Sequence, residues 1–360
     1  MKYRFLIYIS YRYSIPVGIP LEKEILKKGY EVKWYADVAE TKEYIITKSF
    51  VLNNINEVLD YEPDIVLCIT NIVPDFITGL KVQVFHGFNA QKRPSKKNKF
   101  SHFRIRGFFD LYCTQGPSTT VFFKEQALKH PHFEVVETGW SKVDPLFPLE
   151  DYKKDAFPNI LIASTFTPRL SLAHNNEVFK EISRLATTGN YHFNMVLHPK
   201  MDSEILTKWK SLNGRYFTFR DTVDLIPLYK KAHILFADTT SAIQEFVLQK
   251  KPAVVYNNST SESYLIHVTE IEKLKSLFDR ALQYPSEIIS IIETSINKFH
   301  PYFDGKSSER IIEACIYSIH KDKSHISNKP LNVIRKYKIR KKLKYFTLKT
   351  YSHPFTLKKN

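Results

Sequence analysis

The sequence predicts an α/β protein of two doubly wound, Rossmann-like domains that face each other across a central cleft. Apolar runs of strand length alternate with helical stretches along the first part of the chain, and the same alternation starts again at residue 159. The apolar runs are mostly continuous in Val, Ile and Phe, as parallel strands covered on both faces require. A charged break that contains prolines separates the two halves.

The first half begins with an apolar run that is too short for a signal peptide and ends in a charge at Arg12. We interpret this run as the first buried strand. The strands expected in this half are Tyr3–Ile9, Glu31–Tyr35, Asp64–Thr70, Val82–His86, Leu111–Thr114 and Glu134–Thr138. Helical stretches such as Leu21–Lys28 and Ser118–Lys129 lie between them.

The break at residues 146–158 is typical of an interdomain linker, because it combines prolines with a charged run. The second half then predicts strands at Asn159–Ser164, Phe193–His198, Arg215–Arg220, Ile234–Asp238 and Ala253–Tyr256. Helices are expected near Asn175–Leu185, Ser203–Trp209, Val223–Lys231 and Ser241–Leu248, and over much of 269–320. The expected domains are therefore 1–145 and 159–320, joined by the linker at 146–158 and followed by a basic tail at 321–360.

Composition excludes several classes of protein. With 360 residues and 43% hydrophobic residues, the chain is long and apolar enough for a large core. Its three cysteines are far apart in sequence, which excludes a disulfide scaffold and a zinc ribbon. The sequence has no GxGxxG, P-loop or DxD motif. We therefore expect no metal site and no resident cofactor. The apolar runs are also too short to span a membrane.

The net charge of +16 is concentrated in two places. Residues 321–360 contain 13 Lys and Arg and a single acid, whereas the remainder outside the loop at 92–106 is slightly acidic. That loop has seven basic residues and no acid. Such patches attract phosphates of nucleic acid, of an anionic membrane or of a substrate. We expect five of the loop's residues to contact an anionic acceptor or membrane: Lys92, Arg93, Lys96, Lys97 and Lys99.

Two histidines stand at the carboxyl ends of predicted strands, where ligands bind in doubly wound folds. His86 precedes Gly87, and His198 precedes Pro199. An imidazole there can exchange a proton with a substrate near neutral pH. The alternative for each is a strand-terminal histidine bonded to the backbone.

Hydroxyl groups follow two strands of the second half. Asp238 ends one strand, and Thr239, Thr240 and Ser241 then start a helix, so the hydroxyls and backbone N–H groups suit a phosphate. Glu245 follows one turn later, within reach of a ribose hydroxyl. A plain capped helix is the alternative.

A second hydroxyl segment follows the first strand of this half. Ser164 and Thr165, with Arg169, form a further candidate phosphate site. A polar surface turn explains this segment equally simply.

Together with the Asp304–Ser308 segment, these motifs resemble the CDP-glycerol glycerophosphotransferase family of teichoic-acid and capsule polysaccharide biosynthesis, over roughly residues 80–320. The sequence departs from the family pattern at Phe88 and at Thr239-Thr240. The resemblance implies the GT-B architecture and a metal-independent transferase of the cell envelope. The implied enzyme would move a polyol phosphate, with glycerol phosphate the first expectation, from a CDP-polyol to a hydroxyl of a cell-surface glycan or lipid-linked acceptor.

The resemblance also implies that domain 1–145 binds the acceptor and that domain 159–320 binds the donor nucleotide, and it implies roles for single residues. His86 would be the base toward the acceptor hydroxyl, and His198 would stabilise the transferring phosphate. The donor would be bound by Ser164, Thr165, Arg169, Asp238, Thr239, Thr240, Ser241 and Glu245.

Three other functions remain open. A GT-B glycosyltransferase using a nucleotide sugar keeps the fold, and UDP-GlcNAc 2-epimerases show similar Asp238–Glu245 and Asp304–Ser308 segments. A nucleic-acid-binding protein would explain the basic tail, although no specific nucleic-acid motif is present. The tail itself predicts either a basic amphipathic helix on an anionic membrane or a disordered segment. The expected location is the cytoplasm, peripheral on the inner face of the cell membrane.

Overall fold

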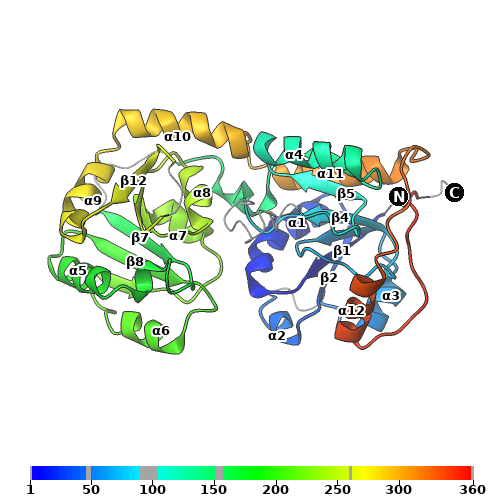
Figure 1. Ribbon diagram of the computed structural model, residues 1–360, viewed down its shortest axis with the longest axis horizontal. Helices are drawn as coiled ribbons and strands as arrows, with labels where there is room; N and C mark the ends of the chain where they lie inside the picture. Colours follow the sequence, from blue (N-terminus) through cyan, green and yellow to red (C-terminus); the bar gives the residue numbers. More distant parts are fainter. Residues whose placement is uncertain (1, 46–49, 89–103, 151–156, 259–261, 358–360) are drawn as a thin grey trace. The chain divides into compact units, whose positions relative to one another are not determined.

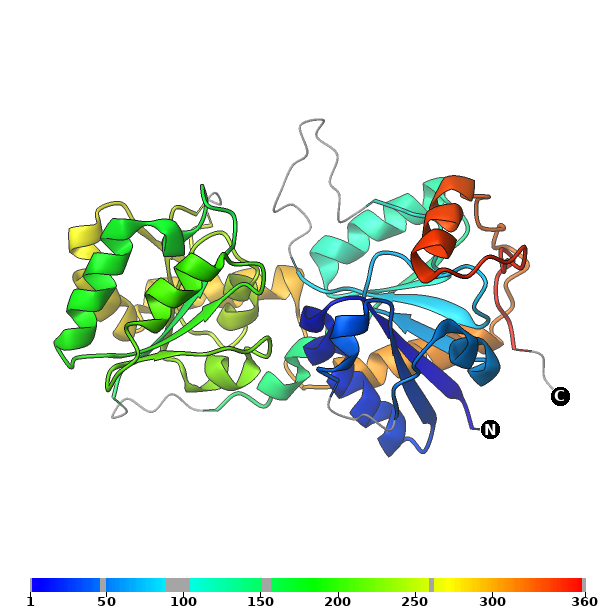
Figure 2. The same cartoon turned by 90° about the horizontal axis from the view of Figure 1, so that it is seen from below.

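The structure is a computed structural model that describes residues 2–45, 50–88, 104–150, 157–258 and 262–357. It divides into two compact units, which are described separately (Figures 1 and 2). Unit 1 contains Met1–Pro145 and Phe299–Asn360, and unit 2 contains Leu146–Lys298. Residues 299–320, placed in the second domain by the sequence analysis, and the tail at 321–360 thus belong to unit 1.

Unit 1 is built on a six-stranded parallel sheet in the order β2-β1-β3-β4-β5-β6. The strands are β1 (Arg4–Ile9), β2 (Glu31–Ala36), β3 (Ile65–Cys68), β4 (Leu80–Val84), β5 (Leu111–Thr114) and β6 (Glu134–Glu137). The helices are α1 (Ile15–Lys27), α2 (Ala39–Lys42), α3 (Ile55–Tyr61), α4 (Pro117–Lys129), α11 (Ser307–His320) and α12 (Val333–Leu343). All strands of this half predicted from the sequence are present.

Alternation along β1 divides the core of unit 1 between the two faces of the sheet. Leu6 and Tyr8 belong to a cluster that also contains residues of α3, α4 and α12. On the opposite face, α1 contacts β1, β2 and α11. The close approach of α1 is possible because Gly18 has no side chain; a Cβ there would lie 2.2 Å from the ring of Trp34. α1 begins earlier than predicted, at Ile15.

The segment 321–357, which we call the C-terminal clasp, is part of the fold of unit 1. In Figure 2 it runs along this unit as the orange-to-red end of the chain. Ile339 of α12 is 5% exposed within the core cluster, and Leu343 and Tyr345 pack against that cluster. Leu357 N donates to the Ile319 carbonyl at 2.9 Å. The sequence analysis offered a basic amphipathic helix on a membrane or a disordered tail; the structure places the helix α12 in this segment and packs it against one face of the sheet.

Unit 2 holds a second six-stranded parallel sheet, in the order β12-β11-β10-β7-β8-β9. Its strands are β7 (Asn159–Ser164), β8 (His192–Leu197), β9 (Phe217–Phe219), β10 (Ile234–Ala237), β11 (Ala253–Tyr256) and β12 (Leu265–Val268). Its helices are α5 (Asn176–Thr187), α6 (Ser203–Lys210), α7 (Ile226–Lys231), α8 (Ala242–Val247), α9 (Leu274–Leu282) and α10 (Ser286–Phe299), which ends at the boundary to unit 1. β12 was not predicted from the sequence.

Candidate functional site

The strand order of unit 2 reverses between β7 and β10. From β7 the chain adds β8 and β9 on one side of the sheet, and then β10, β11 and β12 on the other. In doubly wound sheets, ligands bind beyond the carboxyl ends of the strands at such a switch point. Strand β7 ends at Ser164 and is followed by Thr165, Asp238 follows β10, and His198 follows β8. The topology therefore gathers the predicted donor residues at one edge of unit 2.

The Asp238 side chain is fully buried and joins β10 to the loop after β7. The Ser164 hydroxyl donates to its Oδ2 at 2.6 Å, Thr165 N donates to Oδ1 at 2.9 Å, and Leu172 N donates to Oδ2 at 2.9 Å. Ser164 Oγ also lies 2.8 Å from Ser171 Oγ. A buried carboxylate is stabilised by such convergent donors. Asp238 and Ser164 therefore act from the interior, by fixing the backbone of the loop after β7 at the switch point.

The hydroxyl residues after β10 lie closer to the surface than Asp238. Thr240 and Ser241 are half-buried at the start of α8, and Thr240 Oγ1 accepts from Ala242 N at 3.4 Å. Thr239 is buried, and its hydroxyl donates to the Asn257 carbonyl at 3.4 Å. Of the three predicted residues, Thr240 and Ser241 are thus the better placed to meet a ligand.

Glu245 was expected to hold a ribose. Its side chain is 2% exposed, and its Oε2 accepts a hydrogen bond from the Tyr229 hydroxyl at 3.0 Å. Burial, together with the charge of Glu245, raises the pKa of Tyr229 well above its usual value, so Tyr229 remains a proton donor to the carboxylate. A ribose contact from Glu245 would require its side chain to leave this buried hydrogen bond.

His198 has a defined orientation at the end of β8. Lys200 N donates to its Nδ1 at 3.1 Å, and the ring lies 4.5 Å from the Phe166 ring, centroid to centroid. A backbone N–H can only donate, so Nδ1 is the acceptor, and in the neutral ring the proton resides on Nε2. Nε2–H is consequently the group that this imidazole can offer to a phosphate oxygen.

Arg169 lies on an exposed loop after β7. Asn257 Nδ2 donates to the Arg169 carbonyl at 2.9 Å, and Asn258 Nδ2 donates to the Asp238 carbonyl at 3.1 Å. These two amides connect the loop after β11 to the loops after β7 and β10. The sequence analysis missed them, although a pair of asparagines directly after a buried strand is a readable signal.

His86 follows β4 in unit 1 and is half-buried. The carbonyls on both sides of it are held: Trp140 Nε1 donates to Phe85 O at 2.6 Å, and Gln115 Nε2 donates to Gly87 O at 2.8 Å. The Tyr13 ring lies 5.6 Å from the His86 ring. Buried surroundings raise the pKa of Tyr13 to about 12, so its hydroxyl stays protonated. Gln115 and Tyr13 are neighbours of His86 that sequence reasoning did not identify.

Phe88 belongs to a buried aromatic cluster in unit 1. Its ring centroid lies 4.8 Å from that of Trp140 and 5.7 Å from that of His300. Trp140 N donates to His300 Nε2 at 3.1 Å. Phe88 therefore anchors the end of the His86-Gly87 segment by packing.

The Asp304–Ser308 segment serves a structural role at the start of α11. The Asp144 carboxylate accepts from Ser307 N at 2.9 Å, and from Ser308 N and Oγ at 2.7 and 2.6 Å. These are the bonds of a helix cap. They tie Asp144 to the start of α11, which lies more than 160 residues later in the chain.

Some predicted features lie outside what can be described. The five basic residues Lys92, Arg93, Lys96, Lys97 and Lys99 are not among the described residues. Within the described part of the chain, no group of three or more His, Cys, Asp or Glu side chains is arranged to hold a metal ion. No helix within that same part combines the length and apolarity needed to cross a bilayer.

Comparisons with known proteins identify the fold. No protein-family model matches the sequence, and no curated protein matches it. Solved structures do match. UDP-GlcNAc 2-epimerase from Neisseria meningitidis, bound to UDP-GlcNAc, has a TM-score of 0.58 at 16% identity, over 87% of this chain and 100% of that chain. The wall teichoic acid polymerase TagF has a TM-score of 0.62 at 14% identity, over 87% and 88%.

Further structures agree with these two. TagF soaked with CDPG gives a TM-score of 0.61 at 14% identity, over 87% of this chain and 88% of that chain. A structure from Listeria monocytogenes named for UDP-N-acetylglucosamine 2-epimerase gives 0.59 at 16% identity, over 88% and 96%. At these identities the likeness shows the fold. Together with the two parallel sheets, it establishes that this chain has the two-domain α/β GT-B fold.

Proposed function

We propose that this protein is a transferase that moves a polyol phosphate, with glycerol phosphate the first candidate, from a CDP-polyol to a hydroxyl of a glycan or lipid-linked acceptor. The observation that supports the proposal most directly is the orientation of His198 at the carboxyl edge of the unit 2 sheet, where Nδ1 accepts from Lys200 N and Nε2 carries the proton of the neutral ring. The fold shared with TagF, which was solved with CDPG, adds support.

The chemistry assigns a limited task to each group. The acceptor oxygen forms a bond to the phosphorus of the polyol phosphate, the bond from that phosphorus to the CMP oxygen breaks, and the hydroxyl proton passes to a base. His86 is our candidate for that base. His198 Nε2–H, with Thr240 and Ser241, would stabilise charge on the donor phosphates. Such stabilisation requires no metal ligand from the chain.

An epimerase is the second candidate, since several matching structures are named for that activity. Proton transfer at a sugar carbon needs acid and base groups exposed to the substrate. The two carboxylates singled out in this part of unit 2, Asp238 and Glu245, are both buried and hydrogen-bonded internally. This arrangement favours phosphate transfer.

A donor screen tests the proposal. Thermal unfolding is measured with CDP-glycerol, CDP-ribitol, UDP-GlcNAc and CMP- or GDP-sugars, and CMP release is then followed with and without an acceptor. We expect stabilisation by a CDP-polyol and acceptor-dependent release of CMP. Stabilisation by UDP-GlcNAc alone, with formation of its epimer, would establish the second candidate instead.

Matched histidine variants test the residue roles. Removing a group that stabilises transition-state charge typically costs about 10²–10³-fold in rate. We expect His198→Ala and His86→Ala each to lose about that factor. The controls are His267→Ala on β12 and His130→Ala at the end of α4, which remove exposed histidines from units 2 and 1. Equal activity in His198→Ala and His267→Ala would refute the mechanism.

A further inference from the structure

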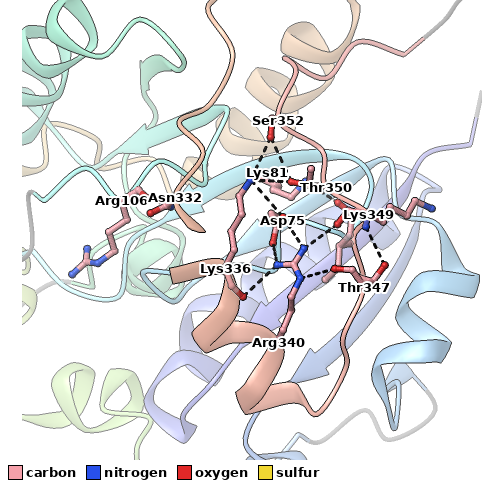
Figure 3. Close-up of polar contacts among 11 residues, drawn as sticks. Asp75, Lys81, Arg106, Asn332, Lys336, Arg340, Thr347, Lys349, Thr350 and Ser352 are labelled. Atoms are coloured by element: carbon pink, nitrogen blue, oxygen red, sulfur yellow. Dashed lines mark hydrogen bonds and ion pairs between the residues drawn. The ribbon is translucent and has the colours of Figure 1, made fainter. Parts of the chain in front are cut away.

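The basic residues of the C-terminal clasp fall into two groups. The first group is paired with carboxylates of the rest of unit 1. Arg340 forms a two-point contact with Asp75, with Nη1–Oδ1 at 2.7 Å and Nη2–Oδ2 at 3.1 Å (Figure 3). Lys342 Nζ lies 2.7 Å from Asp37 Oδ2. Lys329 similarly pairs with the buried Asp110 at 2.6 Å. These cations hold the clasp in place, so their charge is offset internally.

Other side chains of the clasp keep its return loop ordered. Arg340 also donates to the Thr347 and Lys349 carbonyls, at 2.9 and 3.0 Å, and Lys336 donates to Thr350 Oγ1 at 2.9 Å (Figure 3). The Tyr345 ring lies 5.2 Å from the Phe76 ring of the core. The loop after α12 is therefore fixed against the helix from the inside, and its outer side chains have a defined position.

The outer face of α12 is apolar and basic at once. Val333, Ile334 and Tyr337 are exposed there, and Lys338 and Lys341 share the same face, because Val333, Tyr337 and Lys341 are four residues apart in turn, as are Ile334 and Lys338. Ile339 and Leu343 lie on the opposite, core-facing side. The helix thus has two apolar faces: one packs on the core of unit 1, and the other is exposed among lysines.

The return loop extends this outer face. Phe346 and Leu348 are exposed, and the Phe346 ring lies 6.3 Å from that of Tyr337. Together with Val333 they line a groove of about 590 Å³. Lys344 and Lys349 are exposed on the same loop. Among the described residues, no carboxylate lies within salt-bridge distance of Lys338, Lys341 or Lys344, whereas the Lys349 ammonium is engaged by Tyr351.

We propose that this outer face, formed by Val333, Ile334, Tyr337, Phe346 and Leu348 with Lys338, Lys341 and Lys344 around them, docks on an anionic lipid bilayer. An interfacial surface of this kind inserts apolar side chains at the headgroup boundary while lysines contact anionic headgroups. A nucleic acid would bind the lysines but would leave Val, Ile and Leu side chains exposed to water. A second copy of the chain would bring two basic surfaces together.

The proposal differs from binding by a free basic tail, since the clasp stays folded on unit 1. Deleting residues 321–360 is therefore a poor test, because it would uncover the core around Ile339. The proposal also does not rest on the proposed transfer activity, because the surface lies on the clasp and binding is measured without any donor. Failure of one leaves the other unaffected.

The first experiment places a reporter on the surface. The three tryptophans of the chain, Trp34, Trp140 and Trp209, are all buried. A Phe346→Trp variant therefore adds an exposed tryptophan to the full-length protein. With vesicles of equal parts phosphatidylglycerol and phosphatidylcholine, we expect a blue shift of its emission and quenching by brominated acyl chains. No shift at saturating vesicles, or the same shift with pure phosphatidylcholine, would overturn the proposal.

The second experiment separates apolar insertion from charge. Partial burial of two large apolar side chains in the bilayer contributes to the binding free energy. Replacing both, in the double variant Tyr337→Ser with Phe346→Ser, should therefore weaken vesicle binding about tenfold or more. The control is Leu128→Ser, because Leu128 is 86% exposed on α4 of the same unit. Equal binding by the double variant and the control would refute insertion.

Charge reversal is tested against a change of the same size elsewhere. Lys338→Glu with Lys341→Glu should lower binding about tenfold or more. The matched variant, Lys124→Glu with Lys129→Glu on α4, changes the net charge equally and should bind nearly as wild type does. Thermal unfolding checks that each variant is folded. Two results would overturn the proposal by assigning the surface to another occupant. One is dimerisation that the Tyr337 and Phe346 changes abolish. The other is RNA binding that these changes abolish in a protein that does not bind vesicles.

Discussion

The Asp238 carboxylate offers the sharpest test of how the candidate donor site is built. An Asp238→Ala variant removes the acceptor for the Ser164 hydroxyl and for the N–H groups of Thr165 and Leu172, all of which are buried. Each buried donor left without a partner costs about 1–3 kcal/mol. Water entering the vacated space recovers part of that cost, so we expect a local loss of about 3 kcal/mol.

Hydrogen exchange measures that loss where it arises. About 3 kcal/mol corresponds to roughly a hundredfold faster opening. Peptides covering residues 164–173 should therefore exchange about a hundredfold faster in the variant, while a peptide from β1 in unit 1 should be unchanged. Asp221→Ala, which removes an exposed carboxylate from unit 2, is the control. Unchanged exchange at Thr165 and Leu172 would refute the role given to Asp238.

Two further predictions concern unit 1. Arg340→Ala leaves Asp75 buried with much of its charge uncompensated, so we expect the free energy of unfolding to fall by about 3–5 kcal/mol. Thermal unfolding should then begin at a lower temperature. A transition at the wild-type temperature would contradict the role of Arg340 in holding the clasp on unit 1. Burial lowers the pKa of His300 to about 4, so the folded state resists a proton that the unfolded state binds near pH 6.5. The stability that His300 contributes is therefore complete above about pH 6.5 and is lost as the pH falls toward 4, by at most about 3 kcal/mol. His300→Gln should flatten the melting temperature across that interval, and an equally steep profile would contradict this assignment.

Much of the fold follows from the sequence because parallel strands buried on both faces produce continuous apolar runs. The runs at Asn159–Ser164 and Leu111–Thr114 match observed strands residue for residue. β12 escaped prediction because His267 interrupts a run of only four residues. The predicted strand Val82–His86 ends two residues later than β4, which leaves His86 in the connecting loop.

The candidate site was predictable in part. The strand order places His198, Asp238 and Ser164 at one edge of the sheet, as the sequence analysis expected from strand ends. Their separate tasks were not predictable. Whether a carboxylate such as Glu245 is open to a ribose or bonded to Tyr229 depends on which side chains are packed around it. Nothing in the local sequence specifies that packing.

The C-terminal segment shows most clearly what the sequence determines and what depends on the tertiary structure. By itself, the sequence determined that residues 321–360 are strongly basic with interspersed apolar residues. Only the tertiary structure decided which of these charges are offset, since Arg340 meets its partner Asp75 across 265 residues of chain. The physical reason is that the effect of a charge depends on its distance in space from other charges and on its exposure to water. Local sequence determines neither, whereas the packing of α12 on the sheet determines both.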